Sequence, residues 1–338
     1  MKHSKITRWL AAAVCAGASF TSTAALAFSS LTVFGDSLSD SGNNALVIGI
    51  NAGQVITGNT YIPSQPYALG TYSNAQVWVN SFAAGLGLAG GAVPSLAAGG
   101  NHAFGGARTV LDGSFGGFPP SASTQLTGFL GGQAGSLAPD ALFVIAIGGN
   151  DVRAAGAAVG ANPGNALAII SAAAGAYATG VGNMVDALQA RGAGQIVVWG
   201  VPDVGKSPAA LAAGAVNAGT ATFISDSFNQ ALALRLLGEG GVTPFNVAAA
   251  VNQVVANPGL YGLSNVTDAC GAVLGCNPSQ YLFWDGIHPT SAGHQILANA
   301  MLVAVVPEPA AAALMLLGLL GVASAARRRA TRLPAPVR

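Results

Sequence analysis

The sequence predicts an α/β fold in which a mainly parallel sheet is covered by helices on both faces. Short apolar runs, typical of buried strands, alternate along the chain with longer runs at helical spacing. The polar segments that could carry chemistry follow the ends of those runs, as expected where a parallel sheet opens its carboxyl edge. We therefore expect a three-layer α/β/α sandwich over residues 28–305.

The expected elements follow in chain order. Strands are predicted at 31–34, 141–147, 195–201 and 243–247, and helices at 74–88, 163–190, 221–237 and 291–304. Asn162-Pro163 supplies a cap and a first-turn proline for the second helix. In the third helix, apolar residues repeat at every fourth position and predict the buried face: Ile224, Phe228, Leu232 and Leu236.

Three stretches have no strand or helix pattern. The Gly/Ala-rich segments 85–100 and 112–120 are expected to form flexible loops. The insert 49–72 carries three tyrosines, Tyr61, Tyr67 and Tyr72. It is either a wall of a substrate pocket or a plain surface loop.

A serine follows the first strand directly, in Gly35-Asp36-Ser37-Leu38. Gly35 permits a sharp turn, and a helix opening at Ser37 would offer unpaired backbone N–H groups and a favourable dipole to an oxyanion. Serine becomes a nucleophile when a neighbouring base takes its proton. The pattern Gly-x-Ser-x-Ser disfavours the Gly-x-Ser-x-Gly elbow of α/β-hydrolases. The alternative is that Ser37 only caps a helix.

Histidines are few, and one stands in a pattern suited to a general base. His288 follows Asp285 by three residues, and Pro289 favours an extended backbone, so the segment is a loop. A carboxylate that fixes the tautomer makes imidazole an effective base for serine. His294 lies in an apolar helical run and is interpreted as a helix-face residue. His102 precedes a Gly-Gly pair and could border the site without acting in it.

Two further segments could contribute to a binding crevice. Residues 101–109 form a glycine-rich turn in which Gly105-Gly106 allows the backbone to approach a ligand closely. Asn150 follows the strand 141–147, where its amide could point into the crevice. The alternative for Asn150 is an Asx-turn leaving the strand.

These four segments, in this order, resemble the GDSL subgroup of the SGNH hydrolases. The resemblance implies the flavodoxin-like fold of that family, with Ser37 as nucleophile, His288 as base and Asp285 as its orienting carboxylate. It also implies an oxyanion hole made by the backbone N–H groups of Ser37 and Gly106 and by the side-chain amide of Asn150. It implies no cofactor.

The two ends carry targeting patterns. Lys2, Lys5 and Arg8 precede an apolar stretch that closes in Ala25-Leu26-Ala27, so 1–27 is interpreted as a signal peptide for signal peptidase. Within 306–329, Val-Pro-Glu-Pro leads into an uncharged run that spans about 26 Å as a helix, just enough for a thin bilayer. Residues 330–338 form a tail.

The C-terminal segment has two interpretations. Arg327–Arg329 predict a cytoplasmic end, so the run 310–326 is either a permanent anchor or a transient one in the inner membrane. The segment resembles a PEP-CTERM sorting signal, which an exosortase-type enzyme is thought to remove. The resemblance implies a secreted or cell-surface protein exported across the inner membrane of a Gram-negative bacterium.

Charge and cysteine content limit the partners. Residues 28–305 hold five basic and eleven acidic side chains, a net charge of −6, which argues against nucleic acid as a partner. Cys270 and Cys276 are expected to form a disulfide in an oxidising compartment. The three histidines and two cysteines of residues 28–305 have no metal-site spacing.

The function that fits these residues best is hydrolysis of carboxylic esters through an acyl-serine intermediate. Lipid, phospholipid, short acyl and polysaccharide esters would all suit this set of residues. Acyl transfer to an alcohol is the near alternative. The sorting tail also suits a non-catalytic surface or extracellular-matrix protein.

Overall fold

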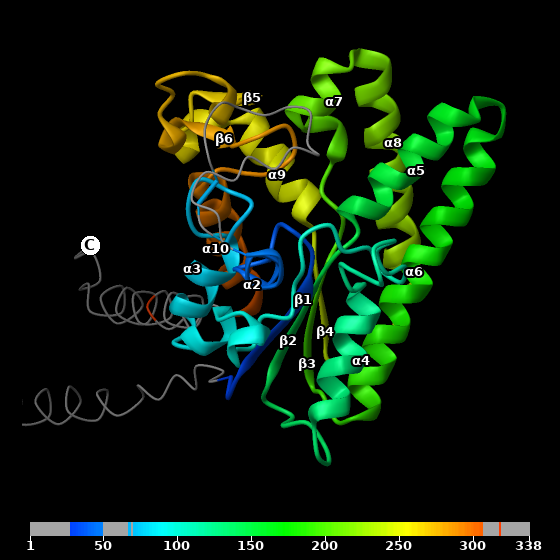
Figure 1. The fold of residues 1–338 in the computed structure, drawn as a ribbon, viewed down its shortest axis with the longest axis vertical. Coiled ribbons are helices and arrows are strands. Elements are labelled where there is room, and N and C mark those ends of the chain that lie inside the picture. The colour runs from blue at the N-terminus through cyan, green and yellow to red at the C-terminus, as the bar shows by residue number, and fades with distance from the viewer. Residues whose placement is uncertain (1–27, 50–66, 69, 307–317, 319–338) are drawn as a thin grey trace, which may run out of the picture. The chain divides into compact units, whose positions relative to one another are not determined.

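Four parallel strands form the central sheet of the computed structural model, which describes residues 28–49, 67–68, 70–306 and 318. In order across the sheet, they are β1 (Leu31–Gly35), β2 (Leu142–Ala146), β3 (Gln195–Trp199) and β4 (Val242–Phe245). Figure 1 shows helices on both sides of this sheet. The predicted fold class is confirmed, and each predicted strand is present within two residues of its expected bounds.

A further extended segment runs parallel to the outer edge of β1. The Val33 N–H donates to the Gly100 carbonyl (2.9 Å), and the Val33 carbonyl accepts from the His102 N–H (2.8 Å). This pairing brings residues 105–109 of the glycine-rich turn close to the end of β1 that leads into Ser37.

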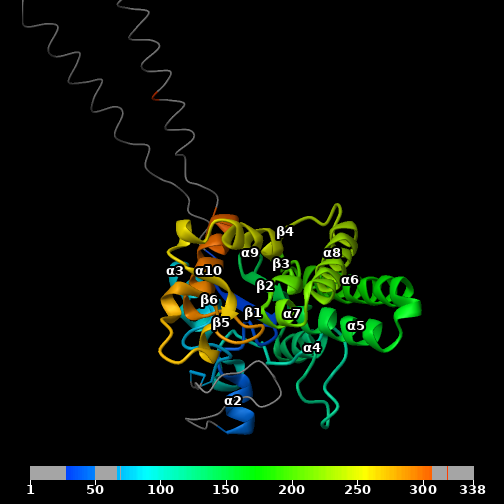
Figure 2. The ribbon, with the colours of Figure 1, turned by 90° about the horizontal axis from the view of Figure 1, so that it is seen from above.

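One face of the sheet is covered by α4 (Ala122–Gly132), α5 (Gly149–Ala161), α6 (Ala166–Ala190) and α8 (Ala215–Arg235), as Figures 1 and 2 show. Alternate strand residues point into this layer, because successive side chains of a strand face opposite ways. The buried strand side chains there include Phe143, Ile145, Ile196 and Val198. The predicted repeat, with three residues in α8 and Leu236 directly after it, belongs to the same core, so its predicted buried face is confirmed.

The other face is covered by α3 (Trp78–Gly85) and α10 (Ser291–Val305), which pack against each other. The ring of Trp78 lies 4.6 Å from that of Trp199 in β3, and the Trp199 indole N–H donates to the Met301 sulfur at 3.0 Å. Helix α3 begins later than the predicted 74. One reason is that the Asn74 side chain pairs with Ser291 at the start of α10.

Shorter elements connect these layers. They are α2 (Asn43–Ile48), α7 (Pro208–Ala212), α9 (Val247–Ala256), a parallel pair β5 (Asn265–Ala269) and β6 (Tyr281–Phe283), and the 3₁₀ helices η1 (Ala89–Ala92), η2 (Ser95–Ala97), η3 (Pro163–Asn165), η4 (Val204–Lys206), η5 (Pro258–Tyr261), η6 (Cys270–Ala272) and η7 (Pro278–Gln280). Helices α4, α5 and α9 were not predicted, because alanine and glycine leave little apolar periodicity in the first two and α9 is short. The Gly/Ala-rich stretch 85–100, expected to be a flexible loop, contains η1 and η2.

Residues 28–305 form one compact unit. Among the described residues, the stretch 163–190 is the one helix long and apolar enough to cross a membrane, and half of its most apolar window is buried inside this unit. The predicted signal peptide lies outside the described residues. So do Tyr61 and the C-terminal segment apart from Val306 and Gly318.

Candidate active site

The turn after β1 places Ser37 at the carboxyl edge of the sheet. Gly35 is required there because a Cβ on it would lie 2.6 Å from the Ala146 carbonyl oxygen. The carbonyl of Asp36 then accepts the N–H groups of Ser39 (3.0 Å) and Asp40 (2.9 Å). The expected helix opening at Ser37 is therefore wrong: the residue lies in a turn, and α2 begins only at Asn43. Neither helix capping nor a helix dipole explains this serine.

The imidazole of His288 lies between a serine hydroxyl and a carboxylate. Its Nε2 is 2.8 Å from the Ser37 Oγ, and its Nδ1 is 2.6 Å from the Asp285 Oδ2. Serine can donate to Nε2 only if Nδ1 carries the ring proton, which then points at Asp285. The structure thus brings together the three residues expected to act as nucleophile, base and orienting carboxylate. All three are buried, with exposed fractions of 8%, 4% and 0% for Ser37, His288 and Asp285.

The loop that carries this pair is fixed by its own backbone and by neighbouring strands. The Asp285 Oδ1 accepts the N–H groups of Ile287 (2.7 Å) and His288 (2.6 Å). The His288 carbonyl accepts the Trp284 N–H at 2.8 Å, and the Thr290 hydroxyl donates to the Tyr281 carbonyl at 2.6 Å. Because both ends of the loop are bonded to β6 or its extension, the imidazole is held in place.

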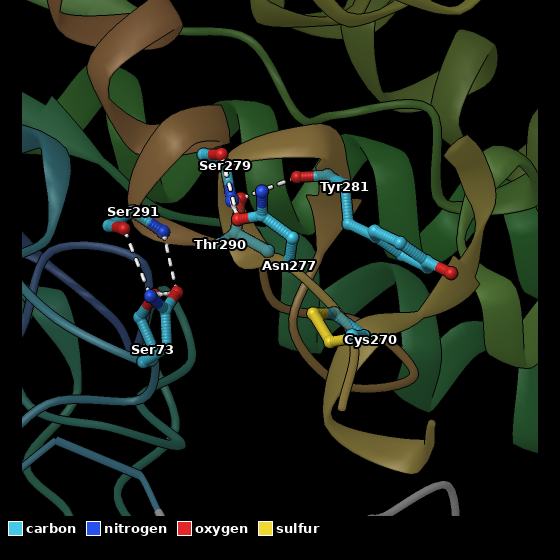
Figure 3. The surroundings of a disulfide bond; sticks show 9 residues. Ser73, Cys270, Asn277, Ser279, Tyr281, Thr290 and Ser291 are labelled. Carbon is cyan, nitrogen blue, oxygen red and sulfur yellow. Dashed lines mark hydrogen bonds between the residues drawn. A yellow bond between two sulfur atoms is a disulfide. The ribbon is translucent and has the colours of Figure 1, made fainter. Parts of the chain in front are cut away.

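The disulfide lies just before this loop in the chain. The structure joins Cys270 to Cys276. Figure 3 shows the disulfide near Tyr281 in β6 and the bonded pair Thr290 and Tyr281. The Gly271 N–H donates to the Trp284 carbonyl at 2.8 Å, which ties the cysteine turn to the residue preceding Asp285.

Of the two neighbouring glycines in the glycine-rich turn, one has a backbone N–H without an acceptor among the described residues. The Gly105 N–H donates to the Asp40 Oδ2 at 2.9 Å. Within the described part of the chain, the Gly106 N–H has no acceptor, and its φ of +83° suits glycine. The sequence alone left these two glycines equivalent in type. The contact with Asp40 leaves Gly106, the residue expected from the sequence, as the glycine that can serve an oxyanion.

Asn150 lies in the first turn of α5, not in an Asx-turn at the end of β2. Its Nδ2 donates to the Ala107 carbonyl at 2.9 Å, so one amide hydrogen positions the side chain beside the glycine turn and the other remains for a ligand. The next residue, Asp151, accepts the N–H and hydroxyl of Thr109 at 3.0 Å each. Helix α5 therefore fixes the far end of the glycine turn.

The Ser37 backbone N–H is also free. Neither a carbonyl nor a side chain among the described residues accepts it, whereas the N–H of Leu38 bonds the Asp36 Oδ1 (3.0 Å). Gly35, on the other side of the turn, is held by Gln125 of α4, which accepts the Gly35 N–H (3.0 Å) and donates to its carbonyl (2.9 Å). Preorganised unpaired donors of this kind stabilise an oxyanion without reorganisation.

Two carboxylates at the site have shifted pKa values of opposite sign. Burial raises the pKa of Asp36 to about 6, although the Leu38 N–H and the nearby His288 counteract it. Burial would also raise the pKa of Asp285, but the His288 imidazole, the Tyr67 hydroxyl and the Ile287 N–H together lower it. Asp285 is therefore the carboxylate that stays ionised beside the imidazole.

The other two histidines lie away from the serine. His102 packs its ring against Phe34 and Phe129, at 5.5 and 5.3 Å between centroids, and burial lowers its pKa. His294 is buried in α10, and burial lowers its pKa to about 3. Neither ring has a contact with Ser37 among the described residues, so His288 is the histidine placed to act as base.

A cavity that is partly open to solvent is lined by Ser37 and His288. Its wall away from the serine is largely apolar and includes Val247, Val251, Phe283, Ile287 and Leu297. The exposed guanidinium of Arg153 stands at this cavity and at a neighbouring hollow between α5, α7 and α8. The arrangement offers room for an apolar chain next to the nucleophile.

Sequence reasoning missed the polar residues that hold the site. Asp40, Asn43 and Asn44 are buried and bond the glycine-rich segment; the Asn43 Nδ2, for example, donates to the Asn101 carbonyl at 2.8 Å. Tyr67 donates to the Asp285 Oδ2 at 2.6 Å. The signal for the first three was the polar run 39–44, which is equally typical of a solvated loop, and Tyr67 was singled out only as one tyrosine of the insert 49–72.

With this geometry established, comparison with known proteins identifies the family. The model of the GDSL-like lipase/acylhydrolase family matches residues 31–301. The chain belongs to this family. The match spans the segments that carry Ser37, Gly106, Asn150, Asp285 and His288.

Similar proteins include enzymes and one uncharacterised chain. An uncharacterised protein from the trpE-trpG intergenic region of Pseudomonas putida is 30% identical, over 88% of this chain and 52% of its own length. A phosphatidylcholine-sterol acyltransferase of Aeromonas hydrophila is 29% identical, over 72% of this chain and 66% of its own. The esterase EstA of Pseudomonas aeruginosa is 32% identical, over 31% and 18%. The chain thus spans about half of the first relative and a smaller share of EstA.

Proposed function

We propose that this protein is a serine hydrolase that cleaves carboxylic esters through an acyl intermediate on Ser37. The observation that carries the proposal is the continuous chain of contacts from the Ser37 Oγ through His288 to Asp285. Membership of the GDSL-like lipase/acylhydrolase family supports ester chemistry at the level of the family.

The reaction begins with attack of the Ser37 oxygen on the ester carbonyl carbon. As the new C–O bond forms, the hydroxyl proton moves to the His288 Nε2, and the Asp285 carboxylate stabilises the imidazolium. The same proton then goes to the leaving alcohol as the ester C–O bond breaks. Water deprotonated by His288 attacks the acyl-serine, and the proton returns to Ser37 as the acid departs.

Negative charge that develops on the carbonyl oxygen meets the free donors. We assign this role to the N–H groups of Ser37 and Gly106 and to the Asn150 amide hydrogen that does not bond Ala107. Loss of one such donor typically costs about 10²–10³ in kcat.

The apolar cavity beside Ser37 supports an ester with a hydrocarbon acyl chain. Each CH₂ group moved from water into such a wall contributes about 0.8 kcal/mol. Residues of the cavity wall such as Val251 and Phe283 are therefore proposed to bind the chain. The substrate class is acyl esters of the lipid type.

Active-site labelling tests the proposal directly. A fluorescent fluorophosphonate should label the wild type and fail to label Ser37→Ala or His288→Ala. Ser39→Ala is the matched control, because its hydroxyl lies in the same turn but accepts the Trp78 indole N–H (3.0 Å) and should be dispensable for labelling. Equal labelling of Ser37→Ala would mean that another residue is the nucleophile, and absence of labelling in the wild type would favour a non-catalytic surface or matrix role.

Acyl transfer on the same site is the second candidate. It is favoured by the similarity to the Aeromonas hydrophila acyltransferase, which covers most of this chain. Transfer requires an alcohol to reach the acyl-serine before water does. Incubation of a p-nitrophenyl ester with the enzyme and a long-chain alcohol separates the two, since a transferase forms a new ester and a hydrolase forms the free acid.

We also propose that residues 1–27 direct export and that the segment after Pro309 is removed, on the sequence pattern of the two ends. Intact mass analysis of protein purified from its native host tests this. The expected mature chain begins near Phe28 and ends near Pro309. A membrane-bound species that retains Arg327–Arg329 would instead indicate a permanent anchor.

A further inference from the structure

Asp285 accepts one hydrogen bond from a residue far away in the chain. Three of its four partners come from its own loop: the N–H groups of Ile287 and His288 on Oδ1, and the His288 Nδ1 on Oδ2. The fourth is the Tyr67 hydroxyl, 2.6 Å from Oδ2 and 218 positions away in sequence. The phenol and the imidazole therefore share one carboxylate oxygen.

Tyr67 is held against this oxygen by aromatic packing. Its ring contacts that of Tyr72 edge to face at 6.5 Å, and Tyr72 in turn packs on the His288 imidazole at 5.5 Å. The Ala68 N–H donates to the Ser73 carbonyl at 2.7 Å, which closes the backbone between the two tyrosines. The Ser73 hydroxyl donates to the Pro289 carbonyl at 2.9 Å. The tyrosine segment is thus bonded to the histidine loop at two separate points.

Among the described residues, Tyr67 and Tyr72 do not line the cavity beside Ser37. The described residues that line it belong to the turn 36–38, to α5, α9 and α10, to the segment 202–207 and to the loop 283–289, and they include neither Tyr67 nor Tyr72. The two interpretations open from the sequence were a pocket wall and a plain surface loop. The contact of Tyr67 with Asp285 fits neither.

We propose that Tyr67 is a positioning residue of the reaction, acting through Asp285 on His288. This rests on the proposed acyl-serine mechanism. The phenol holds Oδ2 in the plane where Oδ2 accepts the hydrogen bond from the Nδ1–H of His288. By donating its own hydrogen bond, the phenol also reduces the negative charge that the carboxylate presents to the imidazole. A charge-assisted hydrogen bond of this kind stabilises its partners more than a neutral one.

Tyr67→Phe removes only the hydroxyl and keeps the ring against Tyr72. With p-nitrophenyl butyrate as probe, we expect kcat to fall about tenfold, as loss of one hydrogen bond to a charged group implies, with KM within about twofold of the wild type. The acidic limb of the kcat/KM profile should move to higher pH, because a carboxylate without its phenol donor holds the imidazolium more tightly. Tyr261→Phe is the control, since its hydroxyl has no hydrogen-bond partner within the described residues.

The outcomes separate this proposal from the proposed function. Wild-type labelling that Ser37→Ala abolishes establishes the acyl-serine mechanism whatever Tyr67 does. An unchanged kcat and pH profile in Tyr67→Phe would overturn the positioning role. A change in KM alone would assign the residue to substrate binding. Equal losses in Tyr67→Phe and Tyr261→Phe, with equal falls in Tm, would reduce the effect to stability.

Discussion

The buried histidine of α10 should make the fold sensitive to acid. His294 is 1% exposed, and neither ring nitrogen has a hydrogen-bond partner among the described residues. Burial lowers its pKa from 6.5 to about 3, with the neighbouring His288 acting in the same direction. The substitution His294→Leu replaces the titratable ring with an uncharged side chain of similar size.

The sign and size follow from proton linkage. Below pH 6.5 the imidazole of residue 294 is protonated in the unfolded chain, whereas in the folded protein it stays neutral down to about pH 3. Its contribution to the free energy of unfolding is therefore fully present above pH 6.5 and is lost as the pH falls. Between pH 7 and pH 4 this loss amounts to about 3 kcal/mol, at about 1.36 kcal/mol per pH unit. That is a large part of the 5–15 kcal/mol typical of a folded protein. The leucine variant should escape it.

Urea unfolding followed by tryptophan fluorescence measures the effect. The free energy of unfolding is determined for wild type and His294→Leu at pH 7, 6, 5 and 4, and the difference between them is plotted, so that groups common to both cancel. The difference should change by about 3 kcal/mol in favour of the variant towards pH 4. Ester hydrolysis at pH 7 should survive. A difference in the free energy of unfolding that does not change with pH, or a loss of activity at pH 7, would contradict this prediction.

Three further predictions concern the reacting groups. Ser37→Ala and His288→Ala should each abolish nearly all hydrolysis, and the double variant should be little worse, because residues that act as one unit are non-additive; steady-state kinetics with p-nitrophenyl butyrate decides this. Asn150→Ala should lower kcat by about 10²–10³ with the fold intact by circular dichroism, whereas a change in KM alone would contradict its oxyanion role. Asp36→Asn should remove a pH dependence of the free energy of unfolding whose sign is opposite to that caused by His294. Because the folded pKa of Asp36 is raised to about 6, its stabilising contribution is full below 3.8 and is lost as the pH rises to 7, by about 2 kcal/mol between pH 4 and 7. Urea unfolding of both proteins checks this, and parallel pH curves would contradict it.

The layers and the residues of the proposed catalytic site could be predicted from local patterns in the sequence. Strand positions and the buried face of α8 follow from apolar periodicity, which acts over a few residues and survives in any environment. The turn glycine before Ser37, the proline after His288 and the carboxylate three residues before it are equally local signals. Each of these positions lies in the structure where its pattern placed it, although the turn at Ser37 replaces the expected helix.

The hydrogen bonds that hold those residues in place depend on the tertiary structure. Whether Gly105 or Gly106 keeps a free N–H depends on Asp40, 65 positions earlier, and the donor that completes Asp285 comes from Tyr67, 218 positions earlier. The burial of His294 without a partner likewise depends on the layer packed over α10. Hydrogen-bond partners between distant segments are chosen by where packing brings the backbone, and no periodicity along the chain encodes that choice. For this reason the sequence predicted the groups proposed to react, while their hydrogen-bond partners became visible only in the fold.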